Sequence, residues 1–281
     1  MVAVSGGVDS VVLLDILAKQ KGLQLVVAHF DHGMRPDSGT DRQFVQKLAE
    51  KYSLPFVDEE GHLGAEASEA KAREARYSFL RAEVRQSGAK AVITAHHQDD
   101  LLETAILNML RGTGRKGLTA LKNQSDILRP LLGVPKSALQ KYAQENHLEW
   151  REDPTNKSQV YLRNYIRHKL LPKFSGKDRA KLLDLLSKTA ATNQQLDSLL
   201  GQMLSRQPEI ERVWFNQLPH AAAREMMAAW LRQNNLRAFD SKTLERLVTA
   251  AKTATAGKQF PVIKGARMKV GHDYLALEGY N

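Results

Sequence analysis

Cysteine is absent from all 281 residues of the sequence. Its absence excludes disulfide bonds, cysteine-ligated zinc, cysteine-ligated iron–sulfur clusters and any mechanism that carries sulfur or an acyl group on a thiol. Long apolar runs are also missing. None approaches the ~18 residues of a membrane span, and the N-terminal residues MVAVSGG lack the features of a signal peptide. We therefore predict a cytoplasmic protein with no membrane partner.

Positive charge is concentrated in the second part of the chain, which has a net charge of +10 overall. Residues 1–160 contain 21 Lys and Arg and 21 Asp and Glu, whereas residues 161–281 contain 20 and 10. A basic segment joined to a neutral one indicates an anionic partner, and nucleic acid is the commonest polyanion. A basic surface that serves only solubility is the alternative.

The first half of the sequence alternates short β-rich runs with helical patterns. Strands are expected near 2–4, 23–30, 55–60, 90–96 and 126–132, and helices near 9–20, 38–52, 68–86, 99–110 and 136–146. Strand–helix repeats with short connections imply right-handed crossovers. We therefore predict an α/β fold with a doubly wound, mostly parallel, five-stranded sheet.

The second half has a different pattern. Leucines between residues 182 and 200 recur at helical spacing and predict a long linker helix. Helices near 219–233 and 240–252 and short strand-like runs at the end favour a smaller, mainly helical second domain, with an α+β domain as the alternative. The expected organisation is a first domain over 1–175, a linker helix over 176–206 and a basic C-terminal domain over 207–281.

The strongest chemical signal is a glycine loop (residues 5–10) between the first strand and the first helix. Its glycines permit a tight turn close to an anion, and the following helix N-terminus contributes its positive dipole. The lysine of a Walker loop is missing, and the pattern is not GxGxxG. We predict a phosphate site; a plain turn with a helix cap is the alternative. Its residues are Ser5, Gly6, Gly7, Val8, Asp9 and Ser10.

Acidic residues and a histidine follow the fourth strand. His97, Asp100 and Glu103 are three residues apart, so they stay near one face of a helix start, and Asp31 ends the second strand. In a doubly wound sheet both segments reach the same crevice. Carboxylates there suit Mg²⁺, for which Asp99 is a further candidate, and equally suit a cationic amine. Plain stabilisation of a helix N-terminus is the alternative.

The glycine loop, as SGGxDS, resembles that of the N-type ATP pyrophosphatases, or PP-loop family. Further segments narrow the resemblance to the tRNA(Ile)-lysidine synthetase family. These segments are DHGMR (31–35), AHHQDDLLET (95–104), RGTG (111–114), GL (117–118), EDPTN (152–156) and RNYIR (163–167). One residue precedes the first expected strand, and the chain ends soon after the second domain, so we expect a short form of the family or an incomplete chain.

The resemblance implies a carbon–nitrogen ligase that uses ATP and Mg²⁺. Such an enzyme adenylates the wobble cytidine of an isoleucine tRNA with a CAU anticodon, and free L-lysine then displaces AMP to give lysidine. Another N-type ATP pyrophosphatase that acts on a different nucleobase, or a non-catalytic tRNA-binding relative, is the alternative. A homodimer is compatible with the sequence and is not decided by it.

The same motifs imply roles for individual residues. The resemblance implies that Asp31, Asp100 and Glu103 bind lysine. Catalytic candidates are Asp31, His97, Asp100, Glu103 and Arg111, and Arg35 joins the glycine loop in binding ATP. The basic C-terminal domain over 207–281 is expected to bind tRNA. Basic and amide side chains in the motifs and around the linker are also expected to contact it, because Arg and Lys bind phosphate. They are Arg115, Lys116, Arg163, Asn164, Arg167, Lys173, Lys177 and Arg179.

Overall fold

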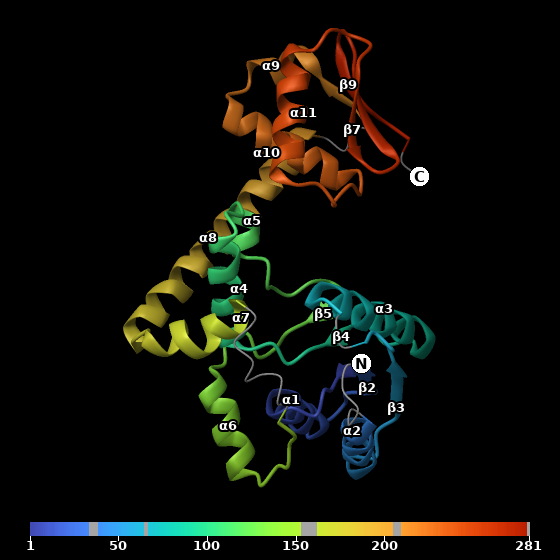
Figure 1. Cartoon of the computed structure of the whole chain (residues 1–281), viewed down its shortest axis with the longest axis vertical. Helices are drawn as coiled ribbons and strands as arrows, with labels where there is room; N and C mark the ends of the chain where they lie inside the picture. Colours follow the sequence, from blue (N-terminus) through green and yellow to red (C-terminus); the bar gives the residue numbers. More distant parts are fainter. Residues whose placement is uncertain (34–38, 65–66, 153–161, 205–208, 280–281) are drawn as a thin grey trace. The chain divides into compact units, whose positions relative to one another are not determined.

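A computed structural model describes residues 1–33, 39–64, 67–152, 162–204 and 209–279, and Figure 1 shows the chain. The chain divides into two compact units, Met1–Thr189 and Ala190–Asn281. The division falls within helix α8 (Gly176–Leu204), which contributes residues to both units. Within those described ranges no helix is both long and apolar enough to cross a membrane.

The first unit is built on a five-stranded sheet. Every pairing is parallel, and the strand order is β3-β2-β1-β4-β5. The central position of β1 follows from Val2, which pairs with Val27 on one side and Ile93 on the other. The prediction of a doubly wound parallel α/β sheet is therefore confirmed. The strands are β1 (Val2–Ala3), β2 (Val27–Asp31), β3 (Phe56–Glu60), β4 (Val92–Ile93) and β5 (Ile127–Leu128).

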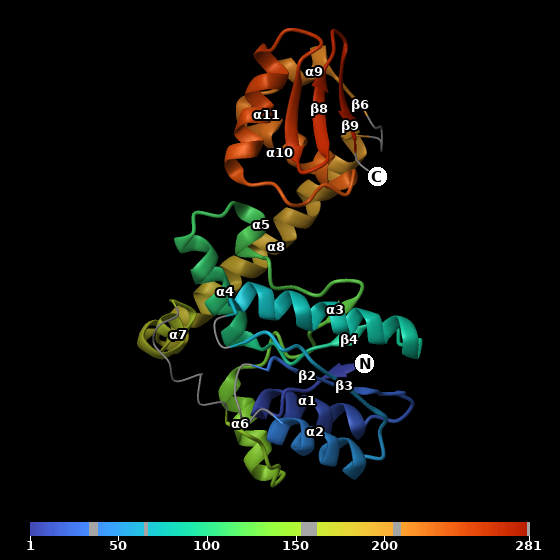
Figure 2. The ribbon, with the colours of Figure 1, turned by 45° about the vertical axis from the view of Figure 1, so that its right-hand side comes forward.

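Helices cover both faces of this sheet, as Figure 2 shows. On one face, buried residues of α1, α2 and α6 form a core with β1 and β2, and on the other face α3 supplies Tyr77, Phe79 and Leu80. Burial on both faces explains the apolar runs LVVA (25–28) and AVIT (91–94) at the inner strands β2 and β4. The helices are α1 (Val8–Ala18), α2 (Gly39–Lys51), α3 (Glu69–Ser87) and α6 (Lys136–Glu145).

A third core joins α4 (Gln98–Leu110) to the chain that leads into α8. Leu102 of α4 packs in one cluster with Ile166, Leu171 and Leu186. The segments involved are short and were not predicted, because three to five residues are too few to reveal a helical period. They are α5 (Arg115–Leu118), α7 (Leu162–Tyr165), the π-helix η2 (Ile166–Leu170) and the 3₁₀-helix η3 (Leu171–Lys173).

The second unit is α+β, one of the two arrangements expected. Its antiparallel sheet has the order β6-β9-β8-β7, and its core includes the fully buried Phe215 and Trp230. Besides the end of α8, its helices are α9 (Arg212–Gln217), α10 (His220–Gln233) and α11 (Ser241–Thr253). Its strands are β6 (Glu209–Glu211), β7 (Gln259–Ile263), β8 (Ala266–Val270) and β9 (Tyr274–Glu278).

Arg212 holds the second unit together through the backbone. Its guanidinium donates to the carbonyl oxygens of Ala251 at 3.0 Å, Gly271 at 2.8 Å and Ala254 at 2.5 Å. We expect Arg212→Met to lower the free energy of unfolding of this unit by about 3 kcal/mol, because three carbonyls lose a charged donor. Chemical denaturation tests this, with Arg237→Met, at an exposed arginine of the same unit, as the control. Equal midpoints for the two variants would contradict it.

Candidate active site

The glycine loop is held in shape by its own hydrogen bonds. Gly6 has φ +89°, a left-handed conformation that favours glycine. The Ser10 hydroxyl donates to the carbonyl of Gly7 at 2.9 Å and accepts from the Ser5 N–H at 3.2 Å. Since the first N–H groups of α1 have no intrahelical acceptor, the loop presents them together with serine hydroxyls as an anion site.

A cavity of about 530 Å³ lies at the carboxyl ends of β1, β2 and β4. This is where the strand order reverses, the usual position of ligands in doubly wound sheets. Seven of the residues predicted from the sequence line it: Ser5, Gly7, Val8, Asp9, Ser10, Asp31 and Asp100. The glycine loop and the two carboxylates are therefore brought to one cavity, whereas Arg35 lies outside the described residues.

His97 joins the glycine loop to helix α4. Its Nε2 atom lies 3.5 Å from a carboxylate oxygen of both Asp9 and Asp100, and its Nδ1 accepts the N–H of Asp99 at 3.2 Å. Burial opposes protonation of His97, but the two carboxylates outweigh burial and raise its pKa. The ring of His97 is buried and does not line the cavity. It therefore acts by holding the carboxylates of Asp9 and Asp100 in position.

Asp9 is kept ionised by its neighbours. Burial acts to raise its pKa, but His97 and Lys136 together lower it below the usual value. The ammonium of Lys136 is 3.3 Å from Oδ2. The other oxygen, Oδ1, is buried and has no hydrogen-bond partner among the residues described. A bound cation at the cavity wall would satisfy this oxygen.

Glu103 is almost fully buried, with 1% exposure, and is bound by two arginines. Arg167 donates to both carboxylate oxygens at 2.6 and 2.8 Å, and Arg163 donates at 3.1 Å. Arg167 also lies 3.4 Å from Asp100. Glu103 does not line the cavity, and both arginines, which were expected to contact tRNA, point inward to carboxylates instead.

Asp99, the residue considered for Mg²⁺, is also paired with an arginine. Its Oδ2 lies 3.2 Å from Arg179, whose guanidinium further donates to the carbonyl of Leu171 at 3.2 Å. Asp99 does not line the cavity. Across the part of the chain that the structure describes, no three His, Cys, Asp or Glu side chains are grouped to hold a metal by themselves.

Arg111 lies at the far end of α4, exposed to solvent and away from the cavity. The 13 residues of the helix separate it from His97 by about 20 Å. The surrounding RGTG motif forms a tight turn after α4. Gly112 has φ +67°, and Asn108 donates to the carbonyl of Gly117 at 2.7 Å. The structure thus places Arg111 outside the group of predicted residues that line the cavity.

The remaining tRNA candidates differ in exposure. Lys173 and Lys177 are exposed, whereas Arg115, Lys116 and Asn164 are half-buried.

Several residues at the cavity were not found from the sequence. Lys136 could have been noticed, since it begins the helix after the fifth strand and that helix starts at the ligand-binding edge. Arg76 lies in the middle of α3, and its place at the cavity could not be predicted from the neighbouring residues. A helical pattern does not show which turn of the helix faces a loop that is distant in the sequence. The additional lining residues include His29, Arg76, Thr94, His96, Lys136, Trp150 and Arg151.

His96 should make the first unit sensitive to acid. Burial lowers its pKa to about 3, with Arg129 and Arg76 adding to the effect and Asp100 opposing it. Between pH 6.5 and 3 the unfolded chain therefore binds a proton that the folded chain does not, and stability falls as pH falls. We expect wild type to lose about 2 kcal/mol relative to His96→Gln between pH 6.5 and 5. Unfolding curves of wild type and His96→Gln at both pH values test this. Equal losses of stability in the two proteins would contradict it.

A sequence model of the PP-loop domain matches residues 1–174 of the chain. The chain belongs to the PP-loop domain family. Residues 5–10 are thus the PP-loop itself, with its N–H groups and hydroxyls at the cavity.

Curated relatives share this sequence beyond the PP-loop. A tRNA(Ile)-lysidine synthase of Thermus thermophilus is 43% identical over 179 residues, covering 61% of this chain and 35% of the relative. A tRNA(Ile)-lysidine synthase of Solibacter usitatus is 32% identical over 292 residues, covering 98% of this chain and 66% of the relative. The chain thus spans between a third and two thirds of the length of these two relatives.

A solved structure agrees with the fold of the PP-loop domain. The U34-tRNA thiolase from Methanococcus maripaludis matches with a TM-score of 0.54 at 16% identity, covering 66% of this chain and 70% of that chain. At this identity the match concerns the fold alone.

Proposed function

We propose that this chain attaches L-lysine to the wobble cytidine of an isoleucine tRNA with a CAU anticodon, in the cytoplasm. ATP adenylates the carbonyl oxygen of the cytidine ring and releases pyrophosphate, and the lysine amine then displaces AMP to give lysidine. The observation that carries the proposal is one cavity with a PP-loop on one wall and the carboxylates of Asp31 and Asp100 on others. The proposal holds for a monomer and for a homodimer alike.

The PP-loop side of the cavity suits the triphosphate of ATP. The hydroxyls of Ser5 and Ser10 and the first N–H groups of α1 can donate to phosphate oxygens, and Lys136 adds a positive charge at the wall. Asp9 is the residue best placed to hold Mg²⁺, because its Oδ1 is buried without a partner among the described residues. When bound there, Mg²⁺ offsets charge on the departing pyrophosphate.

The carboxylates on the cavity wall suit the lysine substrate. Asp31 uses one oxygen to accept the N–H of Gly33 at 2.8 Å, and Asp100 is fixed by the N–H of His97 at 3.0 Å. Both are thereby oriented to bind an ammonium group and to take up the proton that the amine loses on attack. In this account Glu103, expected from the sequence to bind lysine, instead orients two arginines, and His97 holds Asp100 in place.

The wobble base has to leave its stack to reach the cavity, and that motion costs a few kcal/mol. Thiolation of a base through a cysteine is excluded for these 281 residues, since they contain none. A non-catalytic tRNA-binding relative is not favoured, because such a protein has no need of an intact PP-loop with carboxylates across the same cavity.

Pyrophosphate exchange into ATP tests which substrate is activated. We expect labelled pyrophosphate to enter ATP when the protein is given ATP, Mg²⁺ and the CAU isoleucine tRNA without lysine. Exchange that requires lysine but no tRNA would mean that the amino acid is adenylated, and the proposal would then be wrong. A tRNA with uridine at the wobble position is the control and should support no exchange.

A further inference from the structure

The basic excess of the chain is densest in the last part of the first unit. Residues 162–189 contain eight Lys and Arg and two Asp and Glu, whereas the longer stretch 190–281 contains 12 and 8. Charge alone therefore favours the first unit, rather than the second, as the place where a polyanion is bound.

Four of these eight basic side chains already form ion pairs with acidic residues. Arg163 and Arg167 pair with Glu103, Arg179 pairs with Asp99, and Lys188 pairs with Asp184 at 2.7 Å. The other four recur at every fourth position of the sequence and are called the lysine row; each is exposed, with no ion-pair partner in the described part of the chain. The lysine row consists of Lys169, Lys173, Lys177 and Lys181.

Asp178 is the one acidic residue between Lys169 and Lys181 in the sequence. Its carboxylate accepts the N–H of Ser175 at 3.1 Å and the Ser175 hydroxyl at 2.7 Å, and it forms no ion pair with a lysine of the row in the described part of the chain. On the sheet of the second unit, by comparison, Lys269 is paired with Glu278 at 2.9 Å.

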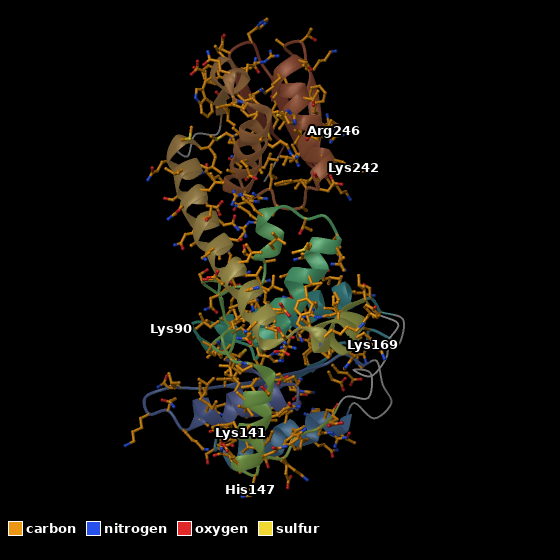
Figure 3. All side chains as sticks on the ribbon, turned by 90° about the vertical axis from the view of Figure 1, so that its left-hand side faces the viewer. Lys90, Lys141, His147, Lys169, Lys242 and Arg246 are labelled. Atoms are coloured by element: carbon orange, nitrogen blue, oxygen red, sulfur yellow. The ribbon has the colours of Figure 1, made fainter. Side chains whose placement is uncertain are left out.

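The segment that carries Lys169 is fixed to the core and contains a residue that lines the cavity. Ile166 and Leu171 are 0% and 1% exposed and pack against α4, so the intervening π-helix is held in place. Within it, Arg167 binds Glu103, and His168 lines the cavity. Lys169 is the next residue along the chain, so the lysine row begins one residue after a side chain that lines the cavity. Figure 3 labels Lys169 in this segment.

We infer that the lysine row binds the phosphate backbone of the tRNA next to the base that enters the cavity. This inference rests on the proposed function, because it takes tRNA as the substrate. Exposed lysines without acidic partners bind phosphates in a sequence-independent and salt-dependent way. The row would guide the anticodon arm, while the PP-loop and the carboxylates act on the base.

Charge reversal of the row tests the inference in the full chain. We compare the fourfold Lys→Glu variant of the row with a matched variant in which Lys21, Lys47, Lys90 and Lys141 are changed to Glu. These four are exposed lysines of the same unit, so the net charge of the two variants is equal. Figure 3 shows Lys90 and Lys141 well apart from Lys169. Affinity for the unmodified CAU tRNA is measured from 50 to 300 mM salt.

We expect the row variant to bind tRNA at least tenfold more weakly than the matched variant. We also expect the slope of log affinity against log salt to fall by roughly 3, since each phosphate contact adds about 0.7–0.9. Equal affinities for the two variants would overturn the inference. So would loss of binding to phosphatidylglycerol vesicles with tRNA affinity unchanged, because the row would then be a lipid surface.

Measurements of tRNA binding and of lysine incorporation distinguish failure of this inference from failure of the proposed function. If wild type incorporates lysine and the row variant does so with an unchanged KM for tRNA, the inference fails and the proposed function stands. If wild type neither binds the tRNA nor incorporates lysine, both fail together.

Discussion

Asp9→Asn is expected to slow the formation of AMP and pyrophosphate by at least a hundredfold. Asparagine keeps the size of the side chain but removes the negative charge that faces His97 and Lys136. It also removes the buried carboxylate oxygen that we assign to Mg²⁺. Loss of one preorganised charged group at a reacting centre costs about 10²–10³ in rate. Single-turnover measurements with saturating tRNA and ATP give the rate directly.

Asp15 provides a matched control on the same helix. It is 2% exposed, and its carboxylate accepts hydrogen bonds from Lys19, Tyr52 and Tyr142, each at 2.7 Å. It does not line the cavity. We expect Asp15→Asn to lower stability and leave the rate of ATP cleavage within about threefold of wild type once folded. Similar rate losses in both variants would mean that the damage is structural and that Asp9 has no special role.

Removing both arginines around Glu103 is expected to lower the stability of the first unit by about 3–5 kcal/mol. The Arg163→Gln, Arg167→Gln variant leaves a carboxylate of 1% exposure without its charged partners. A buried charge without its partner is strongly destabilising, whereas an ion pair removed as a whole costs much less. Adding Glu103→Gln should therefore recover most of the lost stability. Urea denaturation of the double and triple variants measures the recovery.

The single variant Glu103→Gln separates two roles for Glu103. If Glu103 only orients the arginines, the single variant Glu103→Gln changes the KM for lysine by less than about threefold. If Glu103 bound the lysine ammonium, that KM would rise by a factor of about 10 to 100, as expected for loss of a charged hydrogen bond. A rise of that size, or no recovery of stability in the triple variant, would contradict the present account.

Much of the first unit could be predicted from the sequence because its signals are local. Most strands contain a short apolar run and are followed by a helical period, and the topology of such repeats is constrained by handedness. The PP-loop and the placement of Asp31 and Asp100 follow from the same logic. Loops after neighbouring parallel strands have to share one edge of the sheet.

What the sequence could not predict depends on contacts between distant segments. Nothing in the local pattern indicates that Arg167 reaches 64 positions back to Glu103. From residue type alone, Arg163 and Arg167 were predicted to bind the phosphates of tRNA, because arginine commonly binds phosphate. The position of Arg111 could not be predicted for a related reason: it belongs to a matched motif, but the 13-residue helix α4 separates it from the cavity. Lys136 was missed because a lysine at a helix start has no distinguishing spacing.

The most direct test of the central claim is nucleoside analysis of tRNA after reaction with the purified chain. The unmodified CAU isoleucine tRNA is incubated with ATP, Mg²⁺ and isotopically labelled lysine, digested, and analysed by mass spectrometry. We predict that the label appears in a modified wobble cytidine, and only when ATP is present. An unmodified wobble cytidine in a reaction that has consumed ATP, or label attached elsewhere in the tRNA, would contradict the account.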